Sequence, residues 1–190
     1  ITGPQRVSIP LAKPAEIFQD VRVIAYPAPK DDQLIWTPAL GKVNSTPRIT
    51  GLDQLFDQDP LTGVSLPAGT EWVIDMEASA PFTARTLCLR TTHHPMQSPA
   101  ELQVRVPSGE FRTLAQFNIN RSNPALNVGF DPYAPVVIAL PETTATVFRL
   151  VIKNPGAGTG LAEVALSASP RVERYSEKTL AKMHPTPLPY

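Results

Sequence analysis

The sequence predicts a single domain of the all-β class, built as two β-sheets packed face to face. In several segments apolar and polar residues alternate, as they do along strands that bury one face. The 190 residues include 22 prolines, more than twice the usual share of about 5%. Proline is rare inside helices and central strands. Turn-forming residues separate the alternating segments, which favours many short strands over helices.

The clearest alternation occurs in residues 71–77, where Trp72 and every second residue after it are apolar. Residues 101–106 also alternate, and a Pro-Ser-Gly-Glu turn followed by a second predicted strand at 111–118 indicates a hairpin. Residues 136–140 are continuously apolar, which is typical of a strand buried on both faces. The other predicted strands are residues 21–26, 86–91, 147–152 and 161–168.

Two segments are predicted to be helical. Residues 52–56 have the composition of a single helical turn. Residues 176–183 are predicted to form a short C-terminal helix, with Ser176 as its N-cap and Pro185 as its stop.

The predicted organisation is a sandwich at residues 21–170 between two connectors. Residues 1–20 would form an N-terminal connector, and residues 171–190 would lead out through the short helix. The chain begins without methionine and ends in an apolar Pro-Leu-Pro-Tyr sequence. We therefore expect it to be a piece of a larger protein.

The charge balance argues against two classes of partner. Lys plus Arg and Asp plus Glu both number 17, which gives a formal net charge of zero. Nucleic-acid binding and polybasic docking to membranes both depend on an excess of cations, so neither is expected. The lone Cys88 lies in an apolar segment, which favours a buried structural residue over a catalytic thiol.

Two stretches carry a family resemblance. They read LDQLFDQDPLTG at 52–63 with EWVIDM at 71–76, and TVFRLVI at 146–152 with GTGLAEV at 158–164. In order and spacing they resemble the discoidin-like and family 32 carbohydrate-binding modules. The resemblance implies a galactose-binding-like jelly roll. Gln58 stands where that family has glycine, which puts the backbone conformation of its turn in doubt.

In that family the turn and a closing glutamate hold a structural calcium ion. The resemblance implies side-chain ligands from Asp57, Thr62 and Glu163, and backbone carbonyls from Gln54, Asp59 and Ala162. Such a set suits Ca²⁺, which takes about 6–8 oxygen ligands. The alternative is that Asp57 and Asp59 only cap the turn through side-chain hydrogen bonds to the backbone.

A second resemblance concerns the two ends. Residues 18–29 and 177–189 resemble stretches of the family 106 glycoside hydrolases, which are bacterial α-L-rhamnosidases. In those enzymes this region is an accessory β-sandwich beside a catalytic (β/α)8 barrel. The resemblance implies a non-catalytic accessory domain that supports the barrel of an α-L-rhamnosidase-like enzyme and contributes to its substrate cleft. It also implies a rhamnose-containing glycan as ligand and a periplasmic or secreted location.

Catalysis within the chain itself is not expected. Asp75 and Glu77 are the nearest carboxylate pair, and their spacing on a strand places them roughly 7 Å apart. That distance would admit glycoside hydrolysis. However, alternating carboxylates are common on the solvent face of a strand, so the acid and base are expected on the barrel.

Sugar binding is the main alternative to a supporting role. Sugar-binding modules stack a ring on an exposed aromatic residue and fix its hydroxyls with polar side chains. The candidates are Trp36, Arg90, His93 and His94. Trp36 could instead pack against the catalytic domain, and Arg90 could be an ordinary strand-end charge. An independent module for plant polysaccharide and a protein-interaction module therefore both stay open.

Overall fold

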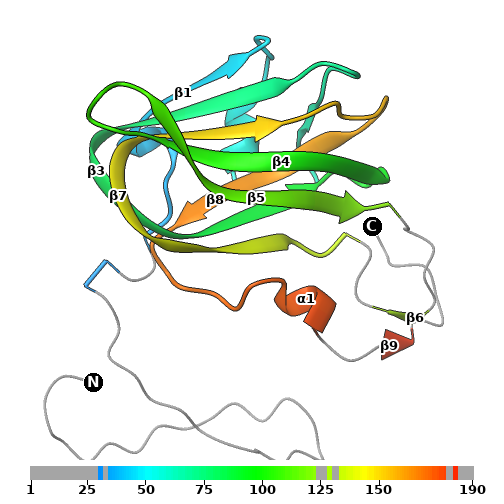
Figure 1. The fold of residues 1–190 in the computed structure, drawn as a ribbon. Coiled ribbons are helices and arrows are strands. Elements are labelled where there is room, and N and C mark those ends of the chain that lie inside the picture. The colour runs from blue at the N-terminus through cyan, green and yellow to red at the C-terminus, as the bar shows by residue number, and fades with distance from the viewer. Residues whose placement is uncertain (1–29, 32–33, 123–127, 130–132, 179–181, 184–190) are drawn as a thin grey trace, which may run out of the picture.

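The computed structural model describes residues 30–31, 34–122, 128–129, 133–178 and 182–183. These residues form a β-sandwich with one very short α-helix (Figure 1). The elements are η1 (Pro38–Leu40), β1 (Gly41–Thr46), η2 (Leu52–Phe56), β2 (Val64–Ser65), β3 (Trp72–Thr91), β4 (Met96–Arg105), β5 (Phe111–Arg121), β6 (Val128–Gly129), β7 (Val136–Ile152), β8 (Gly160–Ser167), α1 (Tyr175–Lys178) and β9 (Lys182–Met183).

Both layers of the sandwich come from one antiparallel sheet that bends over on itself. The strand order is β2-β8-β3-β7-β4-β5, and β1 pairs with the first part of β3. Residues 72–77 of β3 pair with residues 147–152 of β7 in the first layer. Residues 86–89 of β3 pair with residues 136–139 of β7 in the second layer, which β8 and β2 complete.

The bends of β3 and β7 occur where proline interrupts both strands. Pro81 lies in the exposed part of β3 at the first register shift, between Glu77 and Phe82, and Pro141 lies in β7 opposite the second shift, between Ala84 and Thr86. Proline cannot donate to the ladder, so a bend is a place that tolerates it. This explains why 71–77 and 86–91, predicted as separate strands, are two parts of β3. Residues 136–140 and 147–152 are likewise two parts of β7.

The core between the layers confirms the predicted faces. Trp72, Ile74 and Met76 are fully buried, as the alternation predicts, and so are Leu102 and Leu166. Each such side chain contributes about 1.5–3 kcal/mol through burial. The predicted hairpin is also confirmed, since β4 and β5 pair antiparallel across the turn. The predicted strand at residues 21–26 and the connector at 1–20 lie outside the described residues.

The helical predictions have mixed outcomes. The turn at 52–56 is confirmed as the 3₁₀ helix η2. The C-terminal helix is wrong in extent, because α1 covers only Tyr175–Lys178 and Ser176 lies inside it. Residues 182–183 form β9, which pairs with β6. Pairing with a distant segment therefore overrides the local preference for a helix in this part of the chain.

Candidate functional site

The candidate residues His93 and His94 lie at one end of the sandwich. There β3 runs into residues 92–95, β7 runs into residues 153–159, and residues 133–135 lead into β7. The Thr92 amide donates to the Gly160 carbonyl (3.1 Å), which joins residues 92–95 to the start of β8. We call this end of the sandwich the loop end.

An aromatic pair lies at the loop end. The rings of His93 and Tyr133 are 4.8 Å apart between centroids and are tilted by 44°. The Tyr133 hydroxyl donates to the His93 carbonyl (3.1 Å), and partial burial raises the pKa of that phenol. His93 and His94 are exposed. We call His93 and Tyr133 the aromatic platform; Tyr133 is half-buried, and the exposed His94 follows His93 in the chain.

A buried arginine holds Tyr133 in place. Only 1% of the Arg121 side chain is exposed. Its guanidinium donates to the carbonyls of Ala134 (2.6 Å) and Pro135 (2.9 Å), the two residues that follow Tyr133. It also pairs with Glu177 of α1 (3.0 Å). Arg121 therefore ties the platform to the end of β5 and to the C-terminal segment.

Sequence reasoning missed both Tyr133 and Arg121. Tyr133 lies between two prolines outside the predicted strands, which is a weak signal for a binding-site aromatic. Arg121 ends an alternating strand and reads as a surface charge. Its burial depends on carbonyls more than ten residues further along the chain, which no local pattern encodes.

The prediction that Trp36 presents an exposed ring is wrong. Its side chain is fully buried and packs edge-on against Phe56, with ring centroids 5.3 Å apart. The neighbouring Ile35 bridges Ser167, and the Trp36 amide donates to the Leu166 carbonyl (2.8 Å). This segment thus extends the edge of β8, and Trp36 points into the domain's own core. It neither stacks a sugar nor faces another domain.

Arg90 is half-buried and lies opposite Glu163 on the neighbouring strand β8. Its charge acts to lower the pKa of Glu163, so the two groups interact. The structure therefore places Arg90 beside the candidate metal ligands. Sugar binding by Arg90 and His94 stays a prediction.

The residues of the predicted calcium turn, 57–62, do come together. The Thr62 hydroxyl donates to Asp57 Oδ2 (2.8 Å) and also lies 3.1 Å from the Asp59 carbonyl. Asp57 Oδ1 accepts from the Asp59 amide (2.8 Å), and Asp59 Oδ1 accepts from the Leu61 amide (2.9 Å). The capping bonds of the alternative interpretation are thus present. Bonds from the Asp59 amide and Thr62 lower the pKa of Asp57.

Glu163 completes the side-chain set from a distant part of the chain. Its carboxyl group shares a hydrogen bond with Asp57, while its Oε1 atom is buried and has no hydrogen-bond partner. Burial, and then the neighbouring Asp57, raise the pKa of Glu163 to about 7. Two carboxylates this close repel each other unless a proton or a cation lies between them. These hard oxygen donors fit Ca²⁺.

The remaining predicted ligands, Gln54 and Ala162, belong to elements that pack together. The helix η2 contains Gln54 and packs against β8, which contains Ala162. Gly63 approaches β8 so closely that an added Cβ would lie 2.6 Å from the Leu161 carbonyl. Across the part of the chain that the structure describes, no three His, Cys, Asp or Glu residues cluster to hold a metal. The calcium set relies on two carboxyl groups, a hydroxyl and carbonyls.

Gln58, which stands where the resembled family has glycine, adopts a left-handed backbone conformation. Gln58 has φ of 65°, the region that glycine adopts most easily. The turn therefore keeps a conformation that favours glycine, although a larger residue occupies it.

Asp75 is part of a structural ion pair. Arg149 donates to both of its carboxylate oxygens (2.7 and 2.9 Å) and also lies 3.6 Å from the centre of the Phe111 ring. Glu77 is exposed at the next outward position of β3. Burial raises the pKa of the Cys88 thiol, which is opposite to the activation of a nucleophile. Neither the Asp75–Arg149 ion pair nor the Cys88 thiol has the features of a catalytic group.

No protein-family model matches the sequence, and no curated protein does so. Solved structures do match. A family 32 module titled CpGH89CBM32-5, from Clostridium perfringens, in complex with GalNAc-β-1,3-galactose, aligns with a TM-score of 0.56 at 15% identity, over 71% of this chain and 100% of that one. The CBM32 of AlyQ, in complex with 4,5-unsaturated mannuronic acid, gives 0.55 at 13% identity, over 72% and 99%.

A third similar structure is the family 32 module of C. perfringens NanJ in complex with galactose. It gives a TM-score of 0.54 at 8% identity, over 70% of this chain and 96% of that one. The chain has the fold of a family 32 carbohydrate-binding module. This galactose-binding-like jelly roll is the predicted fold class, and identities this low establish the fold alone. Among the described residues, no helix has the length and apolar character needed to cross a membrane.

Proposed function

We propose that this chain is a non-catalytic, carbohydrate-binding accessory domain that holds a glycan at the aromatic platform. The observation that carries the proposal is the pairing of His93 with Tyr133 at the loop end of this particular fold. An aromatic ring can cover the apolar face of a sugar, while exposed donors bind its hydroxyls. His94 is exposed beside the platform and supplies such a donor.

Two observations favour glycan binding at the platform. Arg121 fixes the backbone just after Tyr133, so little conformational freedom is lost when a ligand stacks on the ring. Two of the similar structures are complexes with galactose or a galactose-containing disaccharide. The ligand of the similar AlyQ module is instead a sugar acid, so the three complexes together support a carbohydrate as the ligand class.

The parent protein is proposed to be an α-L-rhamnosidase-like glycoside hydrolase. The support is the resemblance of residues 18–29 and 177–189, which lie largely outside the described residues. SpGH29 is a longer chain that contains the same fold. It matches with a TM-score of 0.54 at 16% identity, over 68% of this chain and only 27% of that one. A rhamnose-containing glycan and a periplasmic or secreted location follow from this parent.

Support of the catalytic barrel is the second candidate function. Leu34 and Val172 are 51% and 65% exposed. Leu34 accepts a backbone hydrogen bond from Ala168, and Val172 follows Arg171, which is bonded to Thr86. Both therefore lie near the end of β8 away from the platform, where apolar contact with another domain would not block the loop end.

We also propose that Asp57, Thr62 and Glu163 hold a structural calcium ion, with carbonyls of Gln54, Asp59 and Ala162. The support is the unpartnered Glu163 oxygen beside Asp57. When bound, the ion would supply the positive charge that this carboxyl pair lacks. The protein residues would then connect the turn after η2 to β8, which steadies the loop end.

A glycan array probed with the 190-residue chain tests the carbohydrate-binding function. We expect retention on neutral glycans that contain galactose or rhamnose. The signal should be lost in Tyr133→Ala and kept in Lys42→Ala, a control on an exposed position of β1. An empty array, or equal retention of Tyr133→Ala and the wild type, would contradict the proposal.

A further inference from the structure

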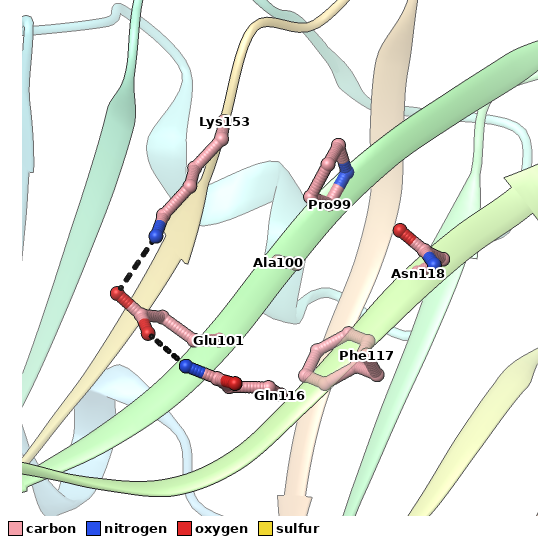
Figure 2. Close-up of a pocket in the computed structure, with 7 residues that line it drawn as sticks. All are labelled: Pro99, Ala100, Glu101, Gln116, Phe117, Asn118 and Lys153. Carbon is pink, nitrogen blue, oxygen red and sulfur yellow. Dashed lines mark hydrogen bonds and ion pairs between the residues drawn. The ribbon is translucent and has the colours of Figure 1, made fainter.

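We infer that the chain has a second sugar-binding site, on the outer face of the sandwich's first layer. A pocket of about 340 Å³ opens there between β4 and β5. Residues 99–101 of β4, residues 116–118 of β5 and Lys153 after β7 line it (Figure 2). We call it the sheet pocket. It shares no residue with the aromatic platform.

A nearly buried carboxylate lies in the sheet pocket. The side chain of Glu101 is 11% exposed and lies 3.4 Å from Lys153 Nζ. Its Oε1 atom accepts a hydrogen bond from Gln103 Nε2 at 3.0 Å. The two hydrogen bonds that its Oε2 atom accepts are both long: 3.4 Å from Gln116 Nε2 and 3.5 Å from Thr113 Oγ1. Bonds to an ionised carboxylate are normally about 2.5–2.9 Å long. Oε2 therefore has capacity for closer donors.

Figure 2 shows how the other groups surround this carboxylate. Lys153 and Gln116 approach Glu101 from opposite sides, while Pro99 and Asn118 form the other end of the pocket. Pro99 and Asn118 are paired across the two strands and both are exposed. The sheet pocket thus combines the Glu101 carboxylate as acceptor, the Lys153 ammonium as donor, the side-chain amides of Gln116 and Asn118, and the apolar ring of Pro99.

This combination matches a neutral pyranose. A sugar hydroxyl can donate to Glu101 Oε2, whose present bonds are long. Lys153 and the amides of Gln116 and Asn118 can donate to sugar oxygens, and the Pro99 ring can contact an apolar sugar face. The charges of Glu101 and Lys153 offset each other, so an anionic or cationic ligand gains no advantage. The volume also falls within the usual range for small-ligand pockets.

The inference rests on the proposed function in that it assumes a glycan-binding domain, but it concerns a separate site. The test is titration of ¹⁵N-labelled chain with methyl α-L-rhamnoside and methyl β-D-galactoside, to about 50 mM so that millimolar affinity is detected. We expect saturable shifts at residues 99–101 and 116–118. Glu101→Gln should weaken this binding about tenfold, since it removes the charge that accepts the hydroxyl donors. Glu77→Gln, on the same outer face, should leave it unchanged.

The outcomes separate the two proposals. Sheet-pocket shifts that persist in Tyr133→Ala support the second site even if the platform proposal fails. Shifts confined to residues 92–95 and 133 would overturn the second site alone, and no shift with either sugar would overturn both. If Glu101→Gln fails to fold, Asn118→Ala replaces it, because Asn118 is exposed and its loss removes a ligand donor only.

Discussion

Replacing Arg121 by methionine should both destabilise the domain and release the aromatic platform. The substitution keeps an unbranched, mostly apolar stem but removes the donors to the carbonyls of Ala134 and Pro135, and it leaves Glu177 without its partner. Breaking a buried ion pair on one side costs about 3–5 kcal/mol. For a domain of this size, a loss of about 4 kcal/mol corresponds to a melting temperature lower by about 8–16 °C.

Thermal unfolding followed by circular dichroism measures this effect. The matched control is Arg112→Met, an exposed arginine on the same strand β5, which should change the free energy of unfolding by less than about 0.5 kcal/mol. Glu177→Gln should cost less than Arg121→Met, because the guanidinium keeps its carbonyl acceptors. A melting temperature for Arg121→Met within about 2 °C of wild type would refute the anchoring role.

Three further predictions concern the calcium turn. Removing calcium with EDTA should lower the melting temperature by about 5–11 °C, because a ligand at a hundred times its Kd adds about 2.7 kcal/mol; an unchanged midpoint would contradict the site. In EDTA the stability should fall as pH rises from about 4.5 to 7, because folded Glu163, with its pKa raised to about 7, keeps a proton that the unfolded chain releases. Thermal melts of Glu163→Gln should lack this slope, and a slope that persisted would exclude Glu163 as its source. Gly63→Ala should cost about 1–3 kcal/mol in urea unfolding, because its Cβ would meet the Leu161 carbonyl. Gly156→Ala, whose Cβ would have ordinary contact distances, should be nearly neutral, and equal costs for the two would contradict the close approach.

The sequence was informative where one local pattern decides the outcome. The alternation from Trp72 onward identified the buried face, because every second residue of a half-buried strand points the same way. The turn at 57–62 brought its oxygen atoms together through bonds over only a few residues. These features depend on spacing, and spacing is visible in the sequence.

Features that depend on distant packing could not be predicted in the same way. Trp36 is buried because its segment extends the edge of β8 and lies against η2, elements far from it in sequence. The bend at Pro81 looks like a loop between strands, yet β3 continues through it as one strand with only a shift of register. The sheet pocket forms only when β4, β5 and the end of β7 meet.

Isothermal titration calorimetry of the isolated chain tests the central claim most directly. The ligand is the neutral oligosaccharide retained most strongly on the glycan array. We expect saturable heat of binding for the wild type and loss of the platform component in Tyr133→Ala, with the fold intact by circular dichroism. No heat of binding, or identical isotherms for wild type and Tyr133→Ala, would contradict it.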